Sequence, residues 1–219
     1  MTDEARGTVQ TDCAGMSAGK KTSVIFDFGG VLIDWNPRHL YRKVFQEAQA
    51  MEDFLATVCT NDWQEMQNET RTWAEAVAER VALFPEHRPL IEMYRSRWLE
   101  MIRDADWETV AIVDALRQRG LRLYGLTNWS AEMFPPTRRR FDFIDWFEGV
   151  VVSGEVGIRK PSPEIFRHLF SRYRVDPNEA VFIDDKAENL AVARSLRLES
   201  HHFTSAANLR TDLEASGLL

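Results

Sequence analysis

The stretch SVIFDFGGVLID, residues 23–34, decides the fold of this chain. A short apolar run ends on the carboxylate of Asp27 and is followed at once by Gly29 and Gly30. Such a run is typical of a strand buried on both faces of a parallel sheet. Ligands of these sheets collect outside the carboxyl ends of the strands, although Asp and Gly also occur together in ordinary turns. Asp27 is therefore the first candidate for a functional residue.

Strand and helix patterns alternate in the second half of the chain. A helical pattern begins at Trp107 and stops at Gly120, a typical helix end. Further strands are predicted at residues 121–126, 149–153, 180–183 and, more weakly, 200–203. Alternation of this kind implies right-handed crossovers, so we expect an α/β fold with a doubly wound parallel sheet.

The segment that follows the first strand has a different pattern. Asn36 and Pro37 resemble a helix start, and apolar residues recur at helical spacing from there to about Asp106, with no convincing strand. We therefore predict a helical insert at residues 36–106 and a core formed by residues 21–35 and 107–219. Residues 1–20 carry few large apolar side chains and are expected to form a mobile tail.

Composition restricts the classes of function. The 219 residues carry a net charge of −7, which argues against a nucleic acid as partner, because phosphate contacts need clustered Lys and Arg. No apolar run approaches the length of a membrane span or of a signal peptide. Two cysteines, Cys13 and Cys59, do not suggest a disulfide framework. We expect a cytoplasmic protein without a membrane partner.

Polar residues follow several of the predicted strands. Because the carboxyl ends of parallel strands meet at one edge, these residues should converge there, together with a lysine from the loop at residues 157–161. They are Asp27, Thr127, Asn128, Lys160, Asp184 and Asp185. Carboxylate oxygens suit Mg²⁺, which keeps several waters and also binds phosphate oxygens of a substrate. The set therefore predicts phosphoryl transfer.

Each residue of this set has a candidate role. Asp27 can attack phosphorus to form an aspartyl-phosphate, which splits one displacement into two easier steps. Mg²⁺ held by Asp27 and Asp184 would shield the charge of both anions. The Thr127 hydroxyl and the Asn128 amide N–H can hydrogen-bond phosphoryl oxygens, and Lys160 supplies a fixed counter-charge.

These motifs resemble those of haloacid dehalogenase superfamily hydrolases. The resemblance is carried in order by residues 26–32, 126–128, 160–161 and 182–189. It implies a Rossmann-like core with a helical cap inserted after the first motif. It also implies that Asp27, Asp184 and the backbone carbonyl of Gly29 bind the metal.

Gly29 departs from the pattern of the family phosphatases, which usually carry a second Asp at this position as general acid and base. General acid–base help is typically worth about 10² to 10⁴ in rate. A subgroup that resembles sugar-1-phosphate phosphatases, and the amino-terminal domain of some epoxide hydrolases, also has Gly here. Either the leaving group is a good one, or Asp34 or His39 replaces the acid, or the domain does not catalyse.

The predicted function is a Mg²⁺-dependent phosphatase acting on a small phosphomonoester such as a sugar phosphate. The alternatives are a 2-haloacid dehalogenase, which the acidic pair Asp184 and Asp185 disfavours, and a non-catalytic binding or regulatory module. Asp185 is expected either to orient Lys160 or a water beside the metal ligands or to cap the helix that follows. Asn189 is expected to support the turn of the fourth motif. Trp35, Trp63 and Met66 can line the cap side of the pocket, although aromatic side chains at helical spacing are more often core.

Overall fold

The computed structural model describes residues 20–68 and 71–219, so the predicted tail, except for Lys20, lies outside the described residues. Five parallel strands in this part of the chain form one sheet in the order β5-β4-β1-β6-β7. Their bounds are β1 (Ser23–Phe26), β4 (Arg122–Thr127), β5 (Gly149–Val152), β6 (Ala180–Asp184) and β7 (Glu199–His202). The expected α/β fold with a parallel, Rossmann-like sheet is confirmed.

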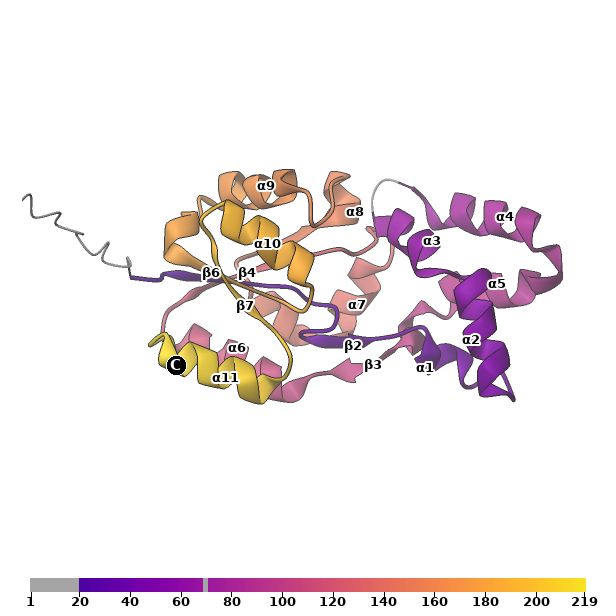
Figure 1. The fold of residues 1–219 in the computed structure, drawn as a ribbon, viewed down its shortest axis with the longest axis horizontal. Helices are drawn as coiled ribbons and strands as arrows, with labels where there is room; N and C mark the ends of the chain where they lie inside the picture. Colours follow the sequence, from indigo (N-terminus) through magenta and orange to yellow (C-terminus); the bar gives the residue numbers. More distant parts are fainter. Residues whose placement is uncertain (1–19, 69–70) are drawn as a thin grey trace, which may run out of the picture.

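Helices cover both faces of the sheet. Figure 1 shows α9 (Pro163–Tyr173) and α10 (Ala187–Ser195) on one side, and α6 (Trp107–Gln118) and α11 (Ala206–Ala215) on the other. Strand β1 contacts the helices on both faces of the sheet. Ile25 packs with α9 and α10, and Val24 and Phe26 pack with α6 and α11. This two-sided burial explains why the first strand is apolar without interruption.

Shorter helices lie in the connections between these strands and helices. They are α7 (Phe134–Arg140), α8 (Ser153–Val156), η4 (Asp142–Trp146) and η5 (Pro177–Glu179). Helix α11 was not predicted, although Ala206, Leu209 and Leu213 form its buried face and the Ser205 side chain accepts a hydrogen bond from the Asn208 N–H at its start. No helix in the described ranges is both long and apolar enough to cross a membrane.

A second group of helices lies beyond the carboxyl end of β1 (Figure 1). These are α1 (Arg38–Tyr41), α2 (Ala48–Thr57), α3 (Asn61–Glu65), η1 (Met66–Asn68), α4 (Trp73–Leu83), η2 (Pro85–His87), α5 (Arg88–Ser96) and η3 (Trp98–Met101). Tyr41, Trp63, Trp73 and Tyr94 form its buried aromatic centre. The chain between β2 (Ile33–Trp35) and β3 (Ile102–Ala105) is therefore helical in its described part.

The prediction that residues 36–106 contain no strand was wrong. Strand β3 (Ile102–Ala105) pairs antiparallel with β2 (Ile33–Trp35), and the pair connects the sheet to the helical insert. Arg103 and Asp104 in the middle of β3 are both exposed, so β3 lacks the alternation by which strands are recognised. Its partner lies far away in the sequence, which leaves no local signal.

Candidate active site

Asp27, Lys160 and Asp184 meet at the carboxyl end of the sheet. Asp27 directly follows β1, and Asp184 ends the neighbouring strand β6. Lys160 Nζ lies 3.0 Å from Asp27 Oδ1 and 2.7 Å from Asp184 Oδ2. All three side chains are buried, and the lysine offsets the charge of only one of the two carboxylates.

The side chain of Asn128 holds the backbone of Lys160 in place. Asn128 Nδ2 donates to the Lys160 carbonyl at 2.9 Å, and Asn128 Oδ1 accepts from the Lys160 N–H at 2.8 Å. The carboxamide thus makes two bonds to one residue from a distant loop. Asn128 therefore positions the lysine through its side chain, a role that was not predicted.

Asn189 orients Asp184. Its Nδ2 donates to both carboxylate oxygens of Asp184 at 2.9 and 3.0 Å, and the Lys186 N–H donates to Asp184 Oδ1 at 2.8 Å. The amide of Asn189 supplies these donors without placing another negative charge beside the buried carboxylate. The start of α10 therefore fixes the direction of the Asp184 side chain.

Asp185 lies beside this group with one oxygen unpaired. Its Oδ1 is buried and has no hydrogen-bond partner in the described part of the chain. A Cβ on Gly30 would lie 2.7 Å from Asp185 Oδ2, and Gly30 has a φ of +80°. Glycine is required at position 30 for both reasons, and its lack of a side chain leaves room for the Asp185 carboxylate.

The acidic residues fit a divalent cation. Asp27, Asp184 and Asp185 each offer a carboxylate oxygen, and these atoms lie within 4.8 Å of one another. An all-oxygen donor set of this kind suits Mg²⁺. The unpaired Asp185 oxygen is an available acceptor for one of the waters that such an ion keeps. Gly29 lines the same cavity as Asp27 and Asp185.

Burial dominates the electrostatics of the site. It raises the pKa of Asp27 to about 7, against the opposing effect of the Lys160 ammonium, and Asp184 adds to the rise. Burial alone would lower the pKa of Lys160, but Asp27 and Asp184 together raise that pKa above its ordinary value. The lysine therefore stays charged, whereas Asp27 holds a proton more readily than an exposed aspartate does.

Thr127 contributes an unpaired hydroxyl. It ends β4, the strand paired with β1, and is almost completely buried. Its Oγ1 has no hydrogen-bond partner among the residues described. A buried hydroxyl without a partner is costly, so a ligand atom that accepts from it would be favoured.

A cavity of about 240 Å³ includes Asp27 in its lining. One side is made by Trp35, Trp98 and Trp129, which we call the indole wall. The ring centroids of Trp35 and Trp98 lie 5.3 Å apart, and those of Trp98 and Trp129 lie 6.3 Å apart. The cavity therefore has an ionic end and a largely aromatic side.

Trp129 adjoins the position where the family phosphatases carry their second Asp. A Cβ on Gly29 would lie 3.6 Å from Trp129 Cζ3, and Gly29 has no left-handed φ that would require glycine. The Trp129 N–H donates to Ser153 Oγ at 3.0 Å, and the Trp129 carbonyl accepts from the Gly154 N–H at 3.0 Å. With its backbone fixed in this way, Trp129 would meet a longer side chain at position 29.

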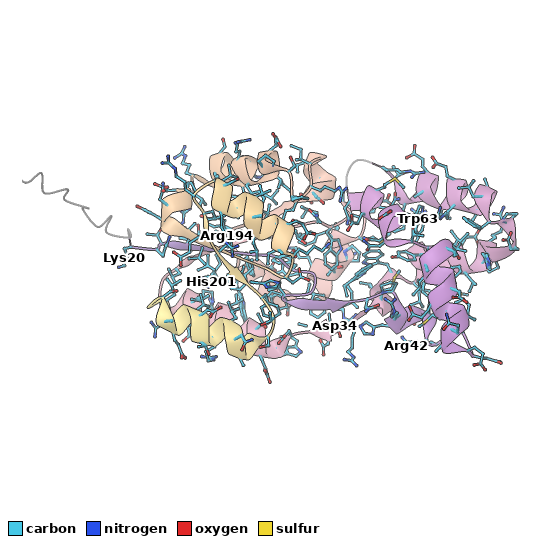
Figure 2. The ribbon with its side chains drawn as sticks, in the orientation of Figure 1. Lys20, Asp34, Arg42, Trp63, Arg194 and His201 are labelled. Carbon is cyan, nitrogen blue, oxygen red and sulfur yellow. The ribbon has the colours of Figure 1, made fainter. Side chains whose placement is uncertain are left out.

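Asp34 and His39 pair with each other outside the cavity. His39 Nε2 lies 2.9 Å from Asp34 Oδ1, and Arg103 lies 3.6 Å from Asp34 Oδ2. Figure 2 shows Asp34 on β2, in the connection between the sheet and the helical insert. Neither Asp34 nor His39 is among the residues that line the cavity in the described chain. Their placement gives no support to a role as the missing acid.

Of the three residues expected from sequence on the cap side of the pocket, Trp35 lines the cavity. Trp63 is core, since it is buried and its Nε1 donates to the Ala76 carbonyl at 3.4 Å. Met66 is 48% exposed. Other lining residues were not predicted, among them Gln64, Glu65, Asn68, Trp98 and Trp129. Of these, Trp129 had a local signal, because it directly follows the second motif.

The fold and site together define a class of protein. The chain belongs to the haloacid dehalogenase-like hydrolase family, whose model matches residues 22–197. The resemblance seen in the motifs is therefore confirmed.

Two relatives and one solved structure share low sequence identity with this chain but match most of its length. A sesquiterpene phosphatase of Aspergillus oryzae is 24% identical over 187 residues, which cover 84% of this chain and 90% of the relative. A D-ribitol-5-phosphate phosphatase of Bacteroides thetaiotaomicron is 24% identical over 202 residues, which cover 87% of this chain and 96% of the relative. A haloacid dehalogenase family enzyme of the same bacterium, solved with magnesium and inorganic phosphate, superposes with a TM-score of 0.66 at 23% identity and covers 85% and 95% of the two chains.

Proposed function

We propose that this protein is a Mg²⁺-dependent phosphatase that hydrolyses a small phosphomonoester through an aspartyl-phosphate. The observation that carries the proposal is the buried lysine bridging Asp27 and Asp184, with Asp185 beside them. Two relatives named as phosphatases support the same chemistry, and their names differ in the leaving group, one a terpene and the other a polyol.

Asp27 is the nucleophile of this mechanism. Its Oδ1 accepts from the Phe28 N–H at 2.7 Å and lies 3.0 Å from Lys160 Nζ, which leaves Oδ2 to attack phosphorus. A bond forms between Oδ2 and phosphorus while the bond to the leaving oxygen breaks. Thr127 Oγ1 donates to a phosphoryl oxygen, and Lys160 balances the charge. Water then attacks phosphorus, the bond between phosphorus and Oδ2 breaks to restore the Asp27 carboxylate, and the proton of the water passes to solvent.

Asp27, Asp184 and the Gly29 carbonyl would hold the cation, with Asp185 nearby. When bound, Mg²⁺ supplies positive charge that stabilises the transferring phosphoryl group. Because Gly29 offers no proton, the leaving oxygen takes its proton from solvent, and esters of acidic alcohols should react fastest. We further propose that residues 36–106 act as a cap over the core of residues 21–35 and 107–219.

The test is release of inorganic phosphate from p-nitrophenyl phosphate, sugar phosphates and acyl phosphates, with Mg²⁺ or with EDTA. We expect Mg²⁺-dependent release that Asp27→Asn abolishes. Release that persists in Asp27→Asn would exclude the mechanism. Halide release from 2-haloacids that is insensitive to EDTA would favour the dehalogenase. Release of neither phosphate nor halide would favour a non-catalytic module.

A further inference from the structure

One helical face forms the cap side of the cavity. Asn61, Gln64, Glu65 and Asn68 are spaced by three, one and three residues along α3 and η1, which places them on the same face. All four line the cavity that contains Asp27. This polar face is therefore a part of the helical insert that a leaving group in the cavity would meet.

Asn68 is the residue of this face whose side-chain oxygen has no hydrogen-bond partner among the described residues. It is 4% exposed, and its Oδ1 is buried without a hydrogen-bond partner in the described chain. An amide oxygen can only accept a hydrogen bond, and leaving it unpaired in a buried site is costly. A ligand group that donates, such as a hydroxyl, would remove this cost.

The indole wall favours a similar ligand. Its flat faces suit carbon–hydrogen surfaces, but Trp35, Trp98 and Trp129 each also have a buried Nε1 without a partner in the described ranges. A plain hydrocarbon would cover the rings and leave the three N–H groups and Asn68 Oδ1 unpaired. A hydroxylated carbon chain offers both apolar surface and oxygen atoms.

We propose that Asn68 determines specificity by accepting a hydrogen bond from a hydroxyl of the leaving group, so that the enzyme prefers polyol phosphates to alkyl phosphates. This inference rests on the proposed phosphatase function. A site built around a substrate hydroxyl discriminates strongly against analogues that lack it, because its own polar groups are then left unpaired.

The experiment compares kcat/KM for a straight-chain pentitol phosphate and for pentyl phosphate, which have equal carbon chains. We expect the wild type to prefer the pentitol ester. Asn68→Leu should reduce the ratio of the two values by roughly 10- to 100-fold. The ratio does not depend on the fraction of enzyme that is active, and Asn68→Ala provides a second variant if the leucine is poorly accommodated.

Gln67→Leu is the matched control. Gln67 lies in the same short helix and is 1% exposed, but its Nε2 donates to the Trp63 carbonyl and it is not among the described residues that line the cavity. In Gln67→Leu, the ratio of kcat/KM for the pentitol ester to that for the pentyl ester should equal the wild-type ratio. An unchanged ratio in Asn68→Leu and Asn68→Ala, or a wild-type preference for pentyl phosphate, would overturn the inference. Turnover of p-nitrophenyl phosphate tests the proposed function separately, and its absence along with that of both esters would reject both.

Discussion

At the scale of single residues, the site depends on polar atoms that the protein itself leaves unpaired. Within the described ranges, Thr127 Oγ1, Asp185 Oδ1 and Asn68 Oδ1 are buried without partners. The side chains of Lys160, Asn128 and Asn189, in contrast, all make hydrogen bonds. These engaged groups fix the geometry of the site. The unpaired groups are the ones that remain available to a ligand.

Thr127→Val tests the unpaired hydroxyl with a side chain of the same shape. We expect kcat/KM to fall by roughly 10- to 100-fold, because a hydrogen bond to a charged phosphoryl oxygen is lost. The melting temperature should not fall, since the hydroxyl has no partner in the described chain.

Thr109→Val is the control for that variant. Thr109 is equally buried and its Oγ1 is also unpaired among the described residues, but it lies on α6, whereas Thr127 ends β4 beside β1. Its kcat/KM should match that of the wild type. Equal losses in both variants would show that the effect is structural rather than a loss of phosphate binding.

The strand-end residues could be predicted because the rule that places them is topological. Asp27, Thr127 and Asp184 each follow an apolar run, and parallel strands bring such ends together. Asn68 and Trp98 could not be found in this way. Their positions depend on how the helical insert packs against the core, and a polar helix face looks the same whether it meets solvent or a cavity.

At the scale of elements, α3 is tied to the core by one carboxylate. Glu65 Oε2 lies 2.9 Å from an Arg159 nitrogen, and Glu65 Oε1 lies 3.5 Å from Lys186 Nζ. Both cations belong to the core, one beside Lys160 and the other at the start of α10. Glu65 also lines the cavity, so this contact holds α3 against the core at the edge of the cavity.

Glu65→Gln should loosen this contact while keeping the side-chain shape. We expect kcat/KM to fall by roughly 3- to 10-fold, mainly through KM, because partly exposed ion pairs contribute modestly. The loss should be smaller at high salt, where the wild-type ion pairs are screened.

Glu92→Gln removes an exposed ion pair with Arg88 within α5 and serves as the comparison. Its kinetics should be those of the wild type at every salt concentration. A Glu65→Gln enzyme with unchanged KM would show that this contact does not shape the cavity.

At the scale of the whole molecule, sheet and helical insert share one apolar cluster. Trp73 in α4 donates through Nε1 to Ser130 Oγ at 3.0 Å, and its backbone N–H donates to Glu132 Oε1 at 2.7 Å. The buried cluster runs from the sheet through the indole wall into the aromatic centre of the insert. A ligand at the junction should therefore stabilise the chain as a unit.

Mg²⁺ should raise the melting temperature at pH 8. At about 100 times its dissociation constant a ligand contributes about 2.7 kcal/mol. For a chain of this size that corresponds to a rise of about 5 to 10 °C. The rise should shrink as the pH falls below 7, because burial raises the pKa of Asp27 to about 7 and the cation must then displace a proton.

Asp184→Asn and an equal ionic strength of NaCl are the controls for this measurement. Neither the variant with Mg²⁺ nor the wild type with NaCl should show the rise. A similar increase in either case would mean that the cation acts elsewhere on the protein.

The indole wall has an optical consequence. Three of the seven tryptophans line the cavity in the described chain, so a bound ligand changes the surroundings of a large share of the chromophores. Ultraviolet emission of the Asp27→Asn protein can then follow ligand binding without turnover and without an attached dye. Intrinsic tryptophan fluorescence can therefore be used to identify the substrate of this protein.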